Sequence, residues 1–149
     1  MKLVSQRGAS RALLALIALG WASCSSSAIC SVSSQGVSFG NYDPFQPSST
    51  DGVGDVSLNC DAVVNATISL STGTGTYETR IMDNGRSQLA YNLYADSQRI
   101  QVWGDGSGGS NTVSRRRRSG DIPVYGTIPA LQNVTAGGYQ DTIIITVTF

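Results

Sequence analysis

Apolar and polar side chains alternate along the last segment of the chain, from Asp141 to Phe149. One set of alternate positions holds Ile143, Ile145, Val147 and Phe149, and the other holds Ile144, Thr146 and Thr148. Because successive side chains of a β-strand point to opposite faces, this pattern predicts a strand with one strongly apolar face. No part of the sequence shows sustained helical periodicity. The sequence therefore predicts an all-β fold.

Several other short segments alternate in the same way and are separated by turn residues. Asp83-Asn84-Gly85 contains a tight-turn signal, because Asn and Gly both tolerate positive φ. Pro123 cannot extend a central ladder, which places its strand near an edge or a bulge. Residues 46–54 are expected to form a linker and residues 104–111 a loop. The expected strands are 31–40, 55–59, 63–71, 81–87, 89–95, 99–103, 122–128 and 141–149, which suggests a sandwich of two sheets.

Residues 1–28 have the features of a secretory signal peptide. Three basic residues lie among the first eleven, and an apolar run follows from Ala12 to Ala22. This run is too short to cross a bilayer as a mature helix, which needs roughly 20 apolar residues. Cleavage is expected after Ala28, with Ala22 as an alternative site and a lipid anchor on Cys24 as another alternative. The mature domain is then 29–149, exported and without a transmembrane segment.

The expected mature chain is weakly acidic. Three of the ten basic residues precede residue 29 and all ten acidic residues follow it, so seven basic residues face ten acidic ones and the net charge is −3. A nucleic-acid partner would favour a basic face. The charge balance therefore argues against nucleic acid as a partner.

Two cysteines, Cys30 and Cys60, stay in the mature chain. An even number of cysteines in an exported protein indicates a disulfide, and two free buried thiols are the alternative. Closing a loop of this length is expected to stabilise the fold by about 3–4 kcal/mol.

The sequence holds no histidine, which excludes serine triads and histidine-based zinc sites. Most of the acidic residues lie beside turn residues, and no motif supports a glycosidase with paired carboxylates. The loop from Asp105 to Asn111 carries oxygen-bearing side chains but lacks the closing Glu of an EF-hand calcium loop. We therefore expect no enzyme activity, no cofactor and no metal.

Arg115, Arg116, Arg117 and Arg118 form the one dense charge cluster of the expected mature chain. Four guanidinium groups could attract phosphate or an acidic polysaccharide, with at most two on one face of a strand. The alternative is a solvated loop or an edge strand whose charges prevent aggregation. Trp103 is a further candidate ligand contact.

Several blocks, taken in order along the whole expected mature chain, resemble the spore coat protein U domain family. The first blocks lie between Cys30 and Cys60, and the later ones are rich in Tyr and Gly. They are Cys30 to Ser33, Val37 to Phe45, Gly54 to Cys60, Tyr91 to Tyr94, Val102 to Gly106, Val124 to Ala130 and Ala136 to Thr142.

The resemblance implies a subunit of an archaic chaperone-usher pilus, a fimbria used in adhesion and biofilm formation. Such pilins have an incomplete immunoglobulin-like β-sandwich, whose open groove is completed by a donor strand. The donor comes first from a periplasmic chaperone and then from the next subunit. The implied partners are this chaperone, an outer-membrane usher and other pilus subunits, and the implied location is the periplasm and then the cell surface or the extracellular space. Ile143, Ile145, Val147 and Phe149 are the expected strand for chaperone docking and the groove.

Two features depart from the family pattern. A donor segment of alternating apolar residues should precede Cys30, but only Ile29 remains after cleavage at Ala28, and residues 23–28 are polar. We therefore expect a subunit that accepts a strand without donating one, at a fibre tip or unpolymerised. The run of arginines is the second departure, and a host or abiotic surface is a candidate target.

Two alternatives belong to other classes of protein. One is a self-contained, secreted carbohydrate-binding sandwich that uses Trp103, Tyr91 or Tyr94 as stacking platforms. The other is a structural protein of a spore or cyst coat. A self-contained module should be a stable monomer when it is made alone, whereas a pilin without its chaperone should aggregate or be degraded.

Overall fold

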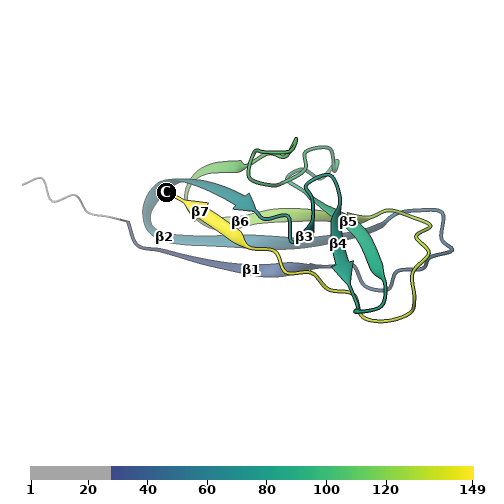
Figure 1. Ribbon diagram of the computed structural model, residues 1–149. Helices are drawn as coiled ribbons and strands as arrows, with labels where there is room; N and C mark the ends of the chain where they lie inside the picture. Colours follow the sequence, from purple (N-terminus) through teal and green to yellow (C-terminus); the bar gives the residue numbers. More distant parts are fainter. Residues whose placement is uncertain (1–27) are drawn as a thin grey trace, which may run out of the picture.

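The computed structural model describes residues 28–149, which form antiparallel β-strands joined by loops (Figure 1). The expected signal peptide and the segment before Cys30 lie almost entirely outside this part. Nowhere between residues 28 and 149 is there a helix of the length and apolar character that a membrane span requires. The strands are β1 (Cys30–Ser38), β2 (Thr50–Leu70), β3 (Thr74–Gly75), β4 (Arg80–Asp83), β5 (Gln88–Tyr94), β6 (Val113–Ile128) and β7 (Ile145–Thr148).

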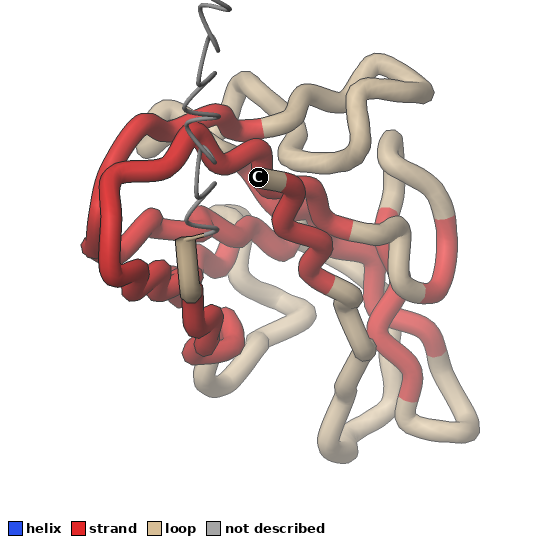
Figure 2. Tube along the Cα trace, turned by 90° about the vertical axis from the view of Figure 1, so that its left-hand side faces the viewer, coloured by secondary structure: helices blue, strands red, loops and turns tan. Residues whose placement is uncertain are grey.

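The strands are ordered β1-β2-β6-β5-β4-β3, and β7 pairs with the last part of β2. The long strands β2 and β6 change register between Asn59 and Val64, and this irregularity bends both strands. The first half of β2 therefore pairs with β1, and its last residues pair with β7. Seen from the left-hand end of Figure 1, the strands curve around an interior and do not lie in one plane (Figure 2). One bent sheet thus supplies both layers of a sandwich.

Several expected strand boundaries were wrong. Residues 55–59 and 63–70 belong to the single strand β2, which continues through a change of register between Asn59 and Val64. This strand also includes residues 50–54 of the expected linker, where Gly52 and Gly54 let β1 approach closely. Residues 99–103 form no strand, and within them only Val102 and Trp103 make isolated bridges. The Asp83-Asn84-Gly85 turn is confirmed, with Gly85 at a φ of 80°.

The core lies between the two layers and is built from alternate residues of the long strands. Val56, Leu58, Ile122 and Val124 are almost completely buried, while the residues between them are exposed or half-buried. Strand β5 adds Leu89 and Leu93 to the same cluster. The expected all-β class, with its period-2 pattern of apolar residues, is therefore confirmed.

Candidate functional site

Strands β1 and β7 each have an outer edge that no strand in the described part of the chain covers. Strand β1 pairs with β2 from Cys30 to Ser38, and β7 pairs with β2 from Ile145 to Thr148. Neither strand has a second partner among residues 28–149. Such an edge presents a row of backbone N–H and C=O groups that another chain can pair with.

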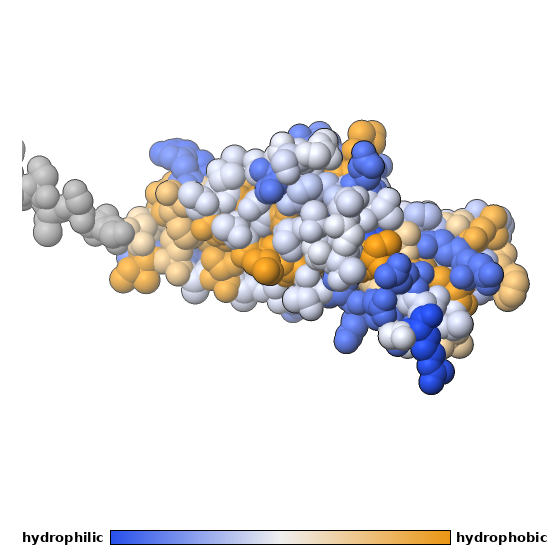
Figure 3. All heavy atoms as spheres, in the orientation of Figure 1, coloured by the Kyte–Doolittle hydropathy of each residue, from blue (hydrophilic) through white to orange (hydrophobic). Residues whose placement is uncertain are grey.

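An apolar groove of about 300 Å³ opens between β1 and the segment that leads into β7. Its walls come from residues 34–39 on one side and residues 139–145 on the other. Its floor is the core itself, formed by Val56, Leu93 and Val124 among others. Figure 3 shows hydrophobic residues gathered in a strip along this face, over the region of β1 and β7 in Figure 1. The core is therefore reachable from the surface between the two free edges.

The C-terminal segment presents one apolar face to the groove, as the sequence pattern predicted. Ile143, Ile145 and Val147 are half-buried and pack against the core. The alternate residue Ile144 is 66% exposed, and Phe149 lies beyond the end of β7 and is 61% exposed. The structure thus places Ile143 and Ile145 in the wall of the groove and Val147 on the same core-facing side of the strand, while Phe149 lies largely in solvent.

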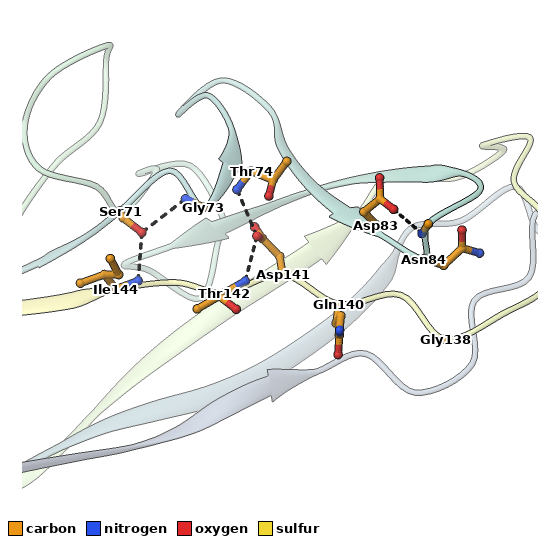
Figure 4. Close-up of a pocket in the computed structure, with 11 residues that line it drawn as sticks. Ser71, Gly73, Thr74, Asp83, Asn84, Gly138, Gln140, Asp141, Thr142 and Ile144 are labelled. Carbon is orange, nitrogen blue, oxygen red and sulfur yellow. Dashed lines mark hydrogen bonds between the residues drawn. The ribbon is translucent and has the colours of Figure 1, made fainter.

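Polar groups anchor the start of this C-terminal segment (Figure 4). The Asp141 carboxylate accepts hydrogen bonds from the backbone N–H groups of Thr74 (3.0 Å) and Thr142 (2.8 Å), and from the Tyr91 hydroxyl (2.6 Å). Burial, together with the hydrogen bond to Asp141, raises the pKa of Tyr91, so its hydroxyl stays protonated and donates. The Ser71 side chain accepts a hydrogen bond from the Ile144 N–H at 2.9 Å. These bonds fix where β7 begins relative to the groove.

Behind this anchor, the side chain of Arg80 is completely buried. Its guanidinium donates to the carbonyl oxygens of Ser71 (2.9 Å) and Trp103 (2.7 Å), and to the side-chain oxygen of Asn92 (2.6 Å). It also lies over the ring of Tyr77. Burial lowers the pKa of Arg80 from its ordinary value, but arginine still keeps its charge at neutral pH. Arg80 therefore joins the end of β2 to β4, β5 and the loop at Trp103.

The expected disulfide between Cys30 and Cys60 is present. The two cysteines are register partners in β1 and β2. The bond joins the first residue of β1 to β2, so it holds one wall of the groove to the sheet.

The expectation that Trp103 contacts a ligand was wrong. Its side chain is fully buried, and the indole N–H donates to the Ile68 carbonyl at 3.0 Å. Tyr91 is only 5% exposed, so it does not offer a ring face to solvent either. The buried position stabilises the fold, because the indole ring removes a large apolar area from water and its N–H group still donates a hydrogen bond.

Arg115 to Arg118 lie in the first half of β6, not in a loop. Their neighbours on β2 are Val64, Asn65 and Ala66. Over this stretch β6 pairs with β2 on one edge, and β5 reaches β6 only at Tyr125 to Thr127. The arginines therefore occupy an edge segment, and the structure does not bring them to the groove.

Sequence reasoning missed Arg80, Ser71 and Asp141. Each lies beside turn or polar residues that read as surface positions, and no local pattern distinguishes a buried arginine from an exposed one. The part of the chain that the structure describes contains no group of three or more His, Cys, Asp or Glu residues that could hold a metal ion.

Two sequence comparisons match most of the chain. The Spore Coat Protein U domain family matches residues 17–146. Protein U of Myxococcus xanthus is 35% identical over 127 residues, which is 76% of this chain and 71% of that protein.

A comparison of structures finds a similar fold. The match is a chain in the crystal structure of a chaperone–tip adhesion subunit pre-assembly complex from archaic chaperone-usher Csu pili of Acinetobacter baumannii. The TM-score is 0.54 at 21% sequence identity, over 82% of this chain and 40% of the solved chain. This chain thus spans less than half of the solved chain that it matches. The likeness, with the open groove, confirms the expected incomplete, immunoglobulin-like β-sandwich of the pilin type.

Proposed function

The chain belongs to the Spore Coat Protein U domain family, and from this premise we propose that it is a subunit of a chaperone-usher pilus. In this proposal the groove between β1 and β7 accepts a strand from a periplasmic chaperone and later from another subunit. An outer-membrane usher would export the subunit, and the cell surface would be its final location. Adhesion and biofilm formation are the expected roles of such a fibre.

The open groove is the observation that carries this proposal. A strand inserted between β1 and β7 would form backbone hydrogen bonds along a free edge and place alternate side chains over Val56, Leu93 and Val124. Each large apolar side chain that it buries would contribute about 1.5–3 kcal/mol. Because the groove reaches the core, this insertion would complete the fold as well as join two chains.

The buried positions of Trp103 and Tyr91 favour the pilus subunit over a carbohydrate-binding module that stacks sugars on these rings. A structural role without catalysis is part of the proposal, supported by the family and the fold. A structural coat protein of a dormant cell is the remaining alternative.

A pair of neighbouring substitutions in β7 tests the proposal. Ile145→Asp places a carboxylate on the apolar groove side, and Thr146→Asp places the same group on the exposed side of the same strand. Burying an unpaired charge is unfavourable, so Ile145→Asp should abolish capture by the chaperone while Thr146→Asp retains it. The measurement is the amount of chaperone that co-purifies with each variant from the periplasm, together with the periplasmic yield.

A peptide provides a second readout on the unchanged protein. A short synthetic peptide in which Ile alternates with Thr should raise the melting temperature, because it binds the folded chain and not the unfolded one. The matched peptide with Asp in place of Ile should have no effect. An unchanged yield of Ile145→Asp, or equal effects of the two peptides, would count against strand insertion.

The position at a fibre tip is a further part of the proposal. It is supported by the polar composition of residues 23–28, which do not alternate as a donor strand does. Strand exchange from this chain into the groove of a pilin that lacks its own donor segment would refute the tip position and leave strand acceptance standing.

A further inference from the structure

The positive charge of the described chain is concentrated in one place, away from the groove. Seven arginines and ten acidic residues lie between residues 28 and 149, and four of the seven arginines are consecutive on β6. Outside these four positions, three arginines are outnumbered by ten acidic residues, so the rest of the described chain carries a net negative charge. An anionic polymer would be repelled by most of this surface and attracted to one segment of it.

We call residues 115–118 the arginine strip. Arg115, Arg116 and Arg118 are exposed and Arg117 is half-buried. None of the four forms an ion pair with a carboxylate in residues 28–149, where the single ion pair joins Arg99 to Asp51. Three of their guanidinium groups donate one hydrogen bond each, to backbone carbonyl oxygens of Ser114, Asp121 and Cys60. Most of the donors of the strip therefore point to solvent.

Asp121, the acidic residue nearest to the strip in the sequence, and Asp61, on the neighbouring strand β2, have other partners. A carboxylate oxygen of Asp121 accepts a hydrogen bond from the Ser57 hydroxyl at 2.7 Å, and one of Asp61 accepts from the Ile29 N–H at 2.9 Å. The strip is thus a positive surface whose charge is not neutralised by the fold.

Neutral polar groups lie beside and at both ends of the strip. Arg116 pairs with Asn65 across the ladder, and the hydroxyls of Thr67 and Ser114 are hydrogen-bonded at 3.1 Å on the pair that precedes the strip. Ser119 and Asn59 form the pair on the other side. Hydroxyl and amide groups of this kind can exchange hydrogen bonds with the hydroxyls of a sugar. Residues 59–67 and 113–121 include no aromatic residue, so the strip lacks the stacking platforms that single-stranded nucleic acids use.

The geometry points to a polysaccharide that carries carboxylates, such as a polyuronate, as the partner of the arginine strip. We propose that this polymer binds along the unpaired edge of β6, between Ser114 and Ser119. Alternate arginines of a strand lie roughly 6.6–6.8 Å apart on one face, so two of the four can contact an extended polymer at the same time. A guanidinium fork matches a carboxylate with two parallel hydrogen bonds, which an ammonium group cannot do. All seven basic residues beyond residue 28 are arginines and none is lysine.

This binding surface does not depend on the proposed groove function, because the strip lies in the first half of β6, whereas β6 contributes to the groove only Val124, in its second half. The test uses the exported protein purified from the periplasm with any chaperone that stays bound. Polygalacturonate is the probe, neutral dextran is the uncharged control, and double-stranded DNA is the control for a different polyanion. Binding is measured at low and at high salt.

Two variants and a matched control keep the test informative. Replacing the four arginines of the strip by Gln should weaken binding of polygalacturonate about tenfold or more. Replacing them by Lys keeps the charge without the fork, so binding should be intermediate. Arg86→Gln removes one exposed arginine elsewhere and should leave binding unchanged. Circular dichroism of each variant establishes that the fold is retained.

For the wild-type protein we expect binding of polygalacturonate that weakens with salt, and none of dextran. Equal binding by the wild-type protein and the Gln variant would overturn the proposal, and so would tighter binding of DNA than of polygalacturonate. If Lys replaces Arg without loss, the strip acts by charge alone and the proposed carboxylate fork is wrong.

Discussion

Replacing Arg80 by Met should destabilise the fold strongly, because its buried guanidinium satisfies one buried and one partly buried backbone carbonyl at once. The change removes the donors to the carbonyl oxygens of Ser71 and Trp103. The side-chain oxygen of Asn92 also loses a donor, but it keeps the N–H of Leu93 at 2.9 Å. Two acceptors are therefore left without a partner.

The magnitude follows from these two acceptors. A buried carbonyl without a partner costs about 1–3 kcal/mol, so the pair costs at most about 2–6 kcal/mol, and the partly buried Ser71 carbonyl contributes the smaller share. Burying a guanidinium is itself costly, and its removal relieves that cost. We therefore expect the lower half of the range, about 2–4 kcal/mol, which is a large fraction of the 5–15 kcal/mol of a typical domain.

The assay is urea unfolding followed by the fluorescence of Trp103, because Trp21 lies in the expected signal peptide. Every variant is measured at the same saturating concentration of the synthetic peptide in which Ile alternates with Thr. Peptide binding then adds a comparable amount to the unfolding free energy of each variant. The control is Arg86→Met, at an exposed position, which should change the unfolding free energy by less than about 0.5 kcal/mol. If Arg80→Met also stays within this limit, the carbonyls do not depend on the guanidinium and the reasoning fails.

Three further predictions concern other parts of the fold. Replacing both disulfide cysteines by serine should cost about 3–4 kcal/mol of unfolding free energy, and a reducing agent should have the same effect on the wild-type protein but none on the variant. Gly54→Ala should lower the melting temperature, because its Cβ would lie 2.5 Å from the backbone carbonyl oxygen of Gln35 on β1, while Gly36→Ala meets no atom within 4 Å and should be tolerated. The pKa of Asp96 is lowered, chiefly by the hydrogen bond from the Gln101 N–H, so its carboxylate stabilises the fold at neutral pH and this contribution is lost as the pH falls through the lowered value. The stability difference between the wild-type protein and Asp96→Asn should therefore shrink below about pH 4, and a difference that is constant from pH 7 to 3 would contradict the assignment.

Local patterns were enough to predict the all-β class and the apolar face of the C-terminal segment that borders the groove. Period-2 alternation reports which side of a strand is apolar, and Ile143, Ile145 and Val147 do lie on the groove side. The disulfide was also predictable, because it depends on the number of cysteines and on export. The same local reasoning failed for β2, where alternation could not reveal that one long strand bends and serves both layers.

The tertiary structure alone decided which residues surround the groove and which are buried. Arg80 and Trp103 looked like surface residues, but contacts with residues distant in the sequence place both in the interior. Arg80 donates to the Trp103 carbonyl, 23 positions away, and Trp103 donates to the Ile68 carbonyl, 35 positions away. The position of the arginine strip on an unpaired edge depends on β5 reaching only the far end of β6. The sequence by itself determined the periodicity of each strand, since side-chain direction depends only on the local backbone. The pairing of strands determined the open edges, because pairing depends on residues far apart along the chain.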